Sequence, residues 1–235
     1  MLRVAIARTD DRLGFGGEAP PALIGEDERL RWTSLPQQGR RDFVASRGLL
    51  RELLCEATGL PADAWAVSAQ AGHPPTARSL QGECTPAPCA SLSHRLGWVA
   101  AAVADSPVGV DVECVRPSRS EPAERAALML AAGELSDWQA LADVRREPAL
   151  LTAWTAKEAW FKSRPAGDAP WDFRRVVARA CAPAQANVRV WESAPLHVAV
   201  CCADAQALAA AECRGLPASS ATSSFWLVSH AASAA

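Results

Sequence analysis

The sequence predicts an α+β fold, because strand patterns and helical patterns alternate along its 235 residues. Each half runs in the order strand, helices, strands, and this order is compatible with a distant duplication, although no short repeat is visible. We expect an N-terminal half at 1–105, a C-terminal half at 106–215 and a tail rich in Ser and Ala at 216–235.

In the N-terminal half, the strand at Leu2–Ala7 is expected to be followed by a helical stretch at Glu26–Thr33. Apolar residues at helical spacing predict a second helix over Asp42–Thr58, and Gly59-Leu60-Pro61 supplies its stop signal. Residues 71–90 are rich in Pro, Gly and Ala and predict turns and a loop. The half closes with a predicted strand over Trp98–Ala104.

The C-terminal half is expected to open with a strand at Val108–Val115, after a turn at Asp105-Ser106-Pro107. Three helical patterns come next, at residues 123–132, 134–145 and 147–162. Short strands are then predicted at residues 176–180, 188–192 and 197–202.

Composition excludes several classes of protein. The formal net charge of −2 gives no electrostatic reason to expect nucleic acid or an anionic membrane as a partner. Charged residues interrupt the first eight positions too early for a signal peptide, so we expect a cytoplasmic protein. The eight cysteines include no Cys-x-x-Cys pair and are interpreted as reduced, small apolar residues.

The first chemical motif is Gly109-Val110-Asp111-Val112-Glu113. Alternate side chains of a strand share one face, so Asp111 and Glu113 are expected to point the same way. Two carboxylates aimed at one place repel each other unless a cation lies between them, and Mg²⁺ prefers such oxygen ligands. An amphipathic strand with two solvated acids is the alternative.

The second motif lies in the helical pattern from Trp154 to Lys162, where Lys157, Glu158 and Lys162 fall on neighbouring rows. A carboxylate beside two lysines is suited to hold a metal or act as a base, while the lysines hold a phosphate. The alternative is an ordinary helix ion pair between Glu158 and Lys162, which stabilises by about 0.2–0.5 kcal/mol.

The third motif is Ser91-Leu92-Ser93-His94-Arg95, expected in a short loop that binds an anion or a nucleotide. If the two strands that flank Asp105 form a hairpin, His94 and Glu113 both lie toward its open end. The order of these three motifs resembles the 4′-phosphopantetheinyl transferase superfamily, specifically its Sfp-type members. The segment Phe43–Arg51 is similar to the N-terminal helix of that family, so the resemblance covers roughly residues 25–165.

The resemblance implies two similar α/β halves related by a pseudo-twofold, with coenzyme A and Mg²⁺ in the cleft between them. It implies an enzyme that transfers 4′-phosphopantetheine from coenzyme A to a serine of an acyl or peptidyl carrier protein and releases 3′,5′-ADP. Glu158 and Lys162 would be catalytic, with Glu158 as the base, directly or through a metal-bound water. The remaining roles follow the motif positions: metal binding by Asp111, Glu113 and Glu158, and coenzyme A binding by Arg47, Ser93, His94, Lys157, Lys162, Arg40 and Arg41.

Departures from the family pattern and inferences about partners complete the expectations. Glu83 stands where the family often has a basic residue, which favours, as an alternative, a non-catalytic binder of coenzyme A or of the carrier. A Mg²⁺-dependent hydrolase of a nucleotide pyrophosphate is a third interpretation. The family docks its carrier near Leu128, Met129 and Leu130, of which we expect at least two in the helix core. Exposed arginines would steer an acidic carrier, and the residues expected to do so are Arg116, Arg119 and Arg125. Two covalently joined halves favour a monomer.

Overall fold

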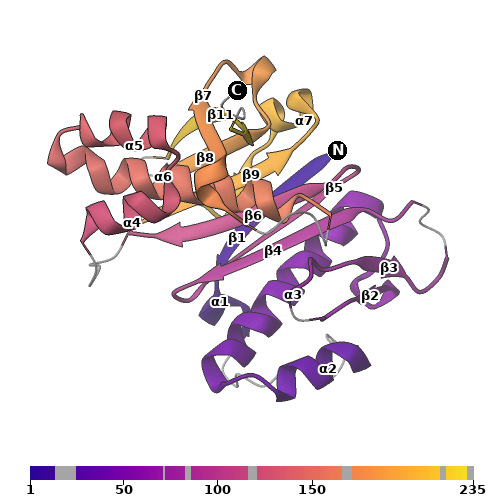
Figure 1. Ribbon diagram of the computed structural model, residues 1–235. Coiled ribbons are helices and arrows are strands. Elements are labelled where there is room, and N and C mark those ends of the chain that lie inside the picture. Colours follow the sequence, from indigo (N-terminus) through magenta and orange to yellow (C-terminus); the bar gives the residue numbers. More distant parts are fainter. Residues whose placement is uncertain are drawn as a thin grey trace.

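The computed structural model describes residues 1–13, 25–70, 72–82, 86–115, 121–165, 171–217 and 221–231. Its elements form an α+β fold, as the sequence predicted, and the structure arranges the strands in two main sheets. Figure 1 shows the helices of the N-terminal half at the bottom of the view, whereas strands of the two halves overlap in its middle. The predicted boundary at residue 105 falls between a strand of the first sheet and a strand of the second.

The first sheet has the strand order β10-β1-β5-β4. A separate two-stranded sheet, β2-β3, precedes β4 in the chain. Strands β1, β5 and β4 are antiparallel neighbours, and β10 pairs in parallel with β1. The bounds are β1 Leu2–Arg8, β2 Trp65–Val67, β3 Ala77–Ser79, β4 Cys89–Arg95, β5 Trp98–Ala104 and β10 Cys213–Arg214.

The second sheet has the order β6-β9-β8-β11-β7 and is antiparallel throughout. Its fourth strand, β11, brings the C-terminal part of the chain into the sheet, because β11 pairs with both β8 and β7. The bounds are β6 Val108–Cys114, β7 Val176–Ala180, β8 Val188–Ser193, β9 Leu196–Cys202 and β11 Thr222–His230.

Seven α-helices and three 3₁₀ turns lie in the described part of the chain. The α-helices are α1 Thr9–Leu13, α2 Glu26–Thr33, α3 Gln37–Thr58, α4 Pro122–Met129, α5 Ala132–Gln139, α6 Asp143–Lys162 and α7 Ala205–Ala210. The 3₁₀ turns are η2 Ala62–Ala64, η3 Phe173–Arg175 and η4 Pro183–Gln185. None of the helices in these described residues is both long and apolar enough to cross a membrane.

The core is layered, and β5 shows how its sequence is matched to the layers. Val99, Ala101 and Val103 pack with the leucines of α3, while Ala100 and Ala102 pack with the second sheet. Because both faces of β5 are buried, the strand is a continuous apolar run rather than an alternating one. On the far side of the second sheet, a third cluster packs α6 against β7, β8, β9 and β11.

Three expectations about local structure were wrong. The stretch that ends in Ser93-His94-Arg95 is strand β4 rather than a short loop, because it pairs with β5 over seven residues. Strands β5 and β6 form no hairpin, since they belong to different sheets. The apolar residues from Phe225 to Val228 were expected in the tail but lie in strand β11. This strand is held by pairing with β7 and β8, which are distant from it in the sequence.

Candidate functional site

The site is built where β6 meets α6, and Gly109 makes this contact possible. Val110 and Val112 of β6 point into the core between the sheets, so Gly109, Asp111 and Glu113 share the opposite face. A Cβ on Gly109 would overlap Ala159 O and lie 2.6 Å from Ser163 N, both backbone atoms of α6. The missing side chain therefore lets the end of α6 lie directly on the acidic face of β6.

Serine hydroxyls of β4 hold the other edge of β6. Ser91 Oγ accepts a hydrogen bond from Val110 N at 2.9 Å, and Ser93 Oγ lies 3.4 Å from Val112 N. Side chains thus replace the backbone ladder where the two sheets adjoin, which satisfies N–H groups that would otherwise be buried without partners. This junction places Ser93 beside Asp111.

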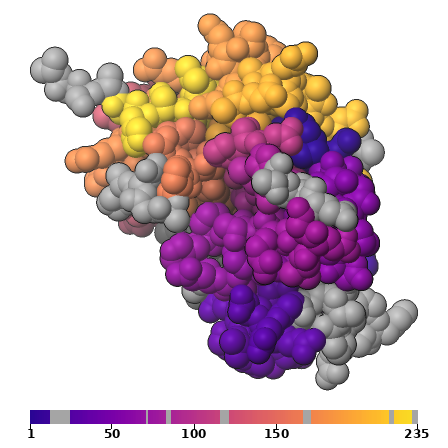
Figure 2. Space-filling view, turned by 90° about the vertical axis from the view of Figure 1, so that its right-hand side faces the viewer, coloured from indigo at the N-terminus to yellow at the C-terminus, as the bar shows by residue number. Residues whose placement is uncertain are grey.

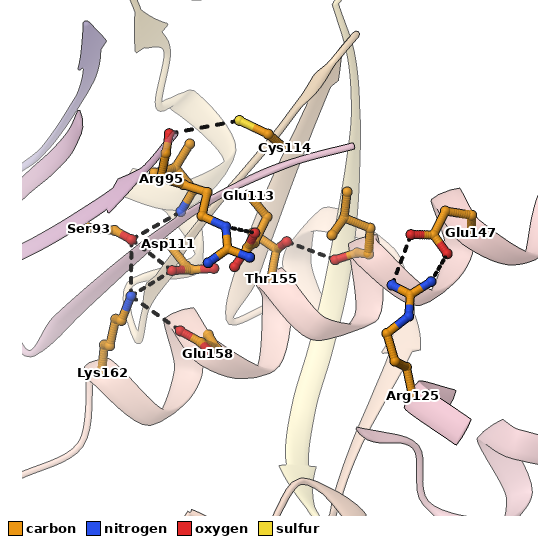
Figure 3. A network of polar contacts seen from close by, with 12 residues as sticks. Ser93, Arg95, Asp111, Glu113, Cys114, Arg125, Glu147, Thr155, Glu158 and Lys162 are labelled. Carbon is orange, nitrogen blue, oxygen red and sulfur yellow. Dashed lines mark hydrogen bonds and ion pairs between the residues drawn. The ribbon is translucent and has the colours of Figure 1, made fainter. Parts of the chain in front are cut away.

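Asp111 is the buried centre of the polar network in Figure 3, with 2% of its surface exposed. Its Oδ1 accepts hydrogen bonds from Lys162 Nζ at 2.6 Å and from Ser93 Oγ at 2.8 Å. Its Oδ2 is buried and has no hydrogen-bond partner among the described residues. One oxygen of this carboxylate is therefore fully engaged, while the other remains available to a ligand.

Glu158 and Lys162 lie one helical turn apart on α6 and face Asp111. Glu158 Oε2 lies 3.4 Å from Lys162 Nζ. Burial, followed by the charge of Asp111, raises the pKa of Glu158 to about 7. Burial alone would lower the pKa of Lys162, but Asp111 and Glu158 outweigh it and raise that pKa. Lys162 is therefore a firmly charged ammonium, whereas Glu158 exchanges its proton near neutral pH.

Glu113 lies at the outer end of the same face. Arg95 Nε, from the end of β4, is 2.9 Å from Glu113 Oε2. Burial and the charge of Asp111 raise the pKa of Glu113, while Arg95 and a hydrogen bond with Trp154 partly oppose this rise. Trp154 is itself held by stacking on Phe173, with ring centroids 4.6 Å apart.

These groups line a cavity of about 520 Å³, which we call the carboxylate cavity. Its acidic residues come from β6 and α6, and its basic residues come from β4, α4 and α6. The charged and polar residues that define it are Ser93, His94, Arg95, Asp111, Glu113, Arg125, Glu147, Glu158 and Lys162.

An adjoining cavity of about 680 Å³ has a different character, and we call it the basic cavity. None of its described lining residues is an Asp or a Glu. Aromatic rings of Phe43, Trp160, Phe161 and Trp171 contribute to its wall. Its basic residues are Arg31, Arg47, His73, His94, Lys162, Arg164 and His230. The two cavities share Leu92, His94 and Lys162, so the ammonium of Lys162 lies at their junction.

Arg47 lies in the wall of the basic cavity, where the resemblance implied a coenzyme A contact. Its Nη1 donates to Ser68 O at 2.6 Å, and its guanidinium packs over the ring of Phe43. Burial, partly offset by Glu28, lowers the pKa of Arg47 to about 10. The side chain is still charged at neutral pH and is fixed in position before any ligand binds.

Three of the basic residues expected to bind coenzyme A do not line either cavity, and these are Arg40, Arg41 and Lys157. Arg40 donates to Leu35 O and Thr33 O near the end of α2, and Arg41 pairs with Asp10 at 2.6 Å. Both side chains are held by protein acceptors and neither lines a cavity, although Leu35, which accepts from Arg40, does line the basic cavity.

Lys157 is the clearest correction. It is fully buried, and its Nζ donates to Glu134 at 2.5 Å, to Met129 O and to Phe173 O. Burial lowers its pKa, and Glu134 partly restores it. Neighbouring residues of a helix point about 100° apart, so Lys157 anchors α4 and α5 while Glu158 faces β6.

Several residues of the basic cavity were missed in the sequence. Arg31 precedes the similar segment, and His230 lies at the end of β11, far from every motif. His73 and Arg164 also line the cavity. No spacing rule in the sequence pointed to Arg31 or Arg164. The fold alone brings His230 to Trp160, and the centroids of the two rings are 5.0 Å apart.

The three apolar residues expected near the carrier divide as predicted, whereas Arg125, expected to be exposed, is partly buried and paired with Glu147. Leu130 is buried and Met129 packs against its cluster, which confirms that two of the three belong to the helix core. Leu128 is 69% exposed on α4. Arg125 forms a two-pronged ion pair with Glu147 in the carboxylate cavity. Glu83, Arg116 and Arg119 lie outside the described residues.

The predicted metal site can be tested against this geometry. Within the described ranges, no three His, Cys, Asp or Glu side chains are grouped closely enough to hold a metal ion as they stand. Asp111, Glu113 and Glu158 nevertheless line one cavity. The buried Oδ2 of Asp111 lacks a hydrogen-bond partner among the described residues, and a positively charged partner would stabilise it best. A donor set of three carboxylates fits Mg²⁺, which takes oxygen ligands.

Two comparisons with known proteins agree with this chemistry. The family model described as "ACPS: 4'-phosphopantetheinyl transferase superfamily" matches residues 107–213, which include the acidic strand and α6. The chain is 29% identical over 153 residues to "4'-phosphopantetheinyl transferase psf-1" of Bacillus pumilus. That alignment covers 65% of this chain and 60% of the relative. The resemblance predicted from the sequence is thereby confirmed.

Proposed function

Because its residues 107–213 match the 4′-phosphopantetheinyl transferase superfamily, we propose that this chain moves 4′-phosphopantetheine from coenzyme A to a carrier-protein serine. The observation that carries the proposal is that the basic cavity, which has no Asp or Glu among its described lining residues, joins the carboxylate cavity at Lys162. A nucleotide rich in phosphate suits the first cavity, and a divalent ion suits the second. The reacting pyrophosphate would then lie at their junction.

The basic cavity would take the 3′-phosphate and the adenosine of coenzyme A. Arg31, Arg47 and Arg164 in its lining supply guanidinium groups, which match phosphate oxygens in geometry and charge. The rings of Trp160 and Trp171 offer flat apolar surface for a base. His94 would contact the phosphate, as the resemblance implied.

The carboxylate cavity would hold Mg²⁺ through Asp111, Glu113 and Glu158. The ion would neutralise charge on the pyrophosphate oxygens. Ser93 would act by positioning, because its hydroxyl binds Asp111 Oδ1 and accepts from Lys162 Nζ at 3.1 Å. This contact directs the ammonium toward the junction of the cavities.

In the proposed reaction, the carrier serine oxygen attacks the β-phosphorus of coenzyme A. A new bond forms between that oxygen and phosphorus, and the bond from phosphorus to the bridging oxygen breaks. The electrons of the broken bond leave with 3′,5′-ADP, whose developing charge Lys162 stabilises. Glu158, which lines the carboxylate cavity, would accept the serine proton.

The carrier would dock at α4, beside the carboxylate cavity. Arg125 and Met129 of this helix line the cavity, and the intervening Leu128 is exposed. An apolar side chain so close to the reaction site suits a helix-bearing partner, and its serine would reach the cavity from this side.

One assay separates transfer from the two alternative functions. The protein is incubated with coenzyme A, Mg²⁺ and an apo-carrier, and the carrier is weighed by mass spectrometry. A mass gain of one phosphopantetheine supports transfer. Breakdown of coenzyme A with an unmodified carrier supports a pyrophosphate hydrolase, and tight binding without any product supports a non-catalytic binder.

Variants then connect the activity to the site. Asp111→Ala and Glu158→Ala are each expected to lower transfer about a thousandfold or more, because each removes a charge needed in the transition state. Asp143→Ala, at the exposed start of the same helix, is the matched control and should transfer at the parent rate. Arg47→Ala should mainly weaken coenzyme A binding. Parent activity in Asp111→Ala would remove that carboxylate from the proposed site.

A further inference from the structure

We propose that Arg95 competes with the divalent ion for Glu113 and thereby sets the affinity of the carboxylate cavity for metal. The inference rests on the proposed function, because it takes Glu113 as a metal ligand. It adds a residue outside the ligand set whose side chain must leave before Glu113 can bind the ion.

The first support is position. Arg95 ends β4, and its Nε lies 2.9 Å from Glu113 Oε2 in the wall of the carboxylate cavity. Figure 3 shows the guanidinium reaching across to the carboxylate face that also carries Asp111. The Arg95 side chain is 35% exposed and that of Glu113 is 12% exposed. Arg95 therefore covers Glu113 from the open side, where it has room to withdraw.

The second support is the quality of the contact. Arg95 Nε is close to Glu113, but it makes no hydrogen bond of good geometry within the described residues. Arg125, in the same cavity, instead binds both oxygens of Glu147 through both terminal nitrogens. Ion pairs with two aligned hydrogen bonds are the strong ones, so Arg95 holds its partner less firmly than Arg125 does.

The third support is the charge balance around Asp111. Ionised Asp111, Glu113 and Glu158 carry three negative charges, and Lys162 supplies one positive charge among them. The remaining charge equals that of one divalent cation in magnitude. With Arg95 on Glu113, one of the charges that the ion would meet is already neutralised. Ion binding and the Arg95 contact therefore oppose each other at Glu113.

Direct measurement of Mn²⁺ binding tests the inference without relying on activity. The bound ion is measured by electron paramagnetic resonance at low ionic strength, in the absence of coenzyme A, for the parent and Arg95→Ala. We expect Mn²⁺ to bind Arg95→Ala about two- to fivefold more tightly, because the variant removes a partly exposed ion pair that competes with the ion. Arg125→Ala is the matched control, because it removes the same charge from the same cavity without touching Glu113.

A second readout follows the side chain itself. In protein labelled with ¹⁵N-arginine, Mg²⁺ should shift the Arg95 Nε–H resonance and leave that of Arg125 nearly unchanged. Equal or weaker Mn²⁺ binding by Arg95→Ala, or an equal gain in Arg125→Ala, would overturn the inference. If Asp111→Asn binds Mn²⁺ as the parent does, the metal assignment of the proposed function fails and the inference falls with it. If Asp111→Asn loses the ion while Arg95→Ala shows no gain, only the inference fails.

Discussion

Substituting Gly109 by alanine should separate α6 from β6 and so dismantle the site from behind. The added Cβ would overlap Ala159 O and come within 2.6 Å of Ser163 N. Real Cβ atoms essentially never approach closer than 3.0 Å, and both obstacles are backbone, so no side chain can turn away. The helix must therefore move as a body, by a distance on the order of 1 Å.

The cost follows from the size of that movement. Overpacking of this kind typically costs about 1–3 kcal/mol, and the lost chain entropy of glycine offsets it by less than about 1 kcal/mol. We expect Gly109→Ala to lower the free energy of unfolding by about 2 kcal/mol. The displacement also separates Glu158 and Lys162 from Asp111, and a shift of about 1 Å can cost roughly a hundredfold in rate.

Urea unfolding and the carrier-modification assay measure the two effects separately. Gly133→Ala in α5 is the matched control, because its added Cβ would meet nothing within 4 Å. That variant should be as stable as the parent or slightly more stable, and fully active. If Gly109→Ala unfolds at the parent urea concentration and keeps the parent rate, the argument that close backbone contact positions α6 is wrong.

Three further predictions address single side chains. Lys157→Met should lower the free energy of unfolding by about 3 kcal/mol, since it leaves Glu134 without its buried partner. The folded variant should keep the parent KM for coenzyme A, and a raised KM would restore the expected role of Lys157 in coenzyme A binding. With a chelator present, the free energy of unfolding of the parent should fall from pH 4.5 to 8 relative to that of Glu158→Gln, because a pKa raised to about 7 means that the folded state binds the proton more tightly. Urea unfolding should show a difference that reaches roughly 1–3 kcal/mol, and the same pH dependence in both proteins would contradict it. Leu128→Asp should raise the KM for the carrier severalfold, because it replaces an apolar side chain of the proposed docking surface with a charge. The melting temperature should not change, because Leu128 is exposed, and an unchanged KM would place docking elsewhere.

Much of the candidate site was predictable because it depends on local spacing. Alternation along a strand is enough to place Asp111 and Glu113 on one face, and i,i+4 spacing is enough to pair Glu158 with Lys162. The order of the motifs also indicated a resemblance to the superfamily whose model matches residues 107–213. The pseudo-twofold relation of the halves and the cleft between them stay predictions.

Other features depended on contacts between distant segments. Periodicity shows that Lys157 and Glu158 point in different directions, but it cannot say which of them faces β6 and which faces Glu134. The small side chains that let α6 approach β6 decide that question. Likewise, β11 joins the sheet and delivers His230 to the basic cavity because β7 and β8 present free edges to it. Backbone geometry along one segment sets which residues share a face, whereas packing across the whole chain decides what that face meets.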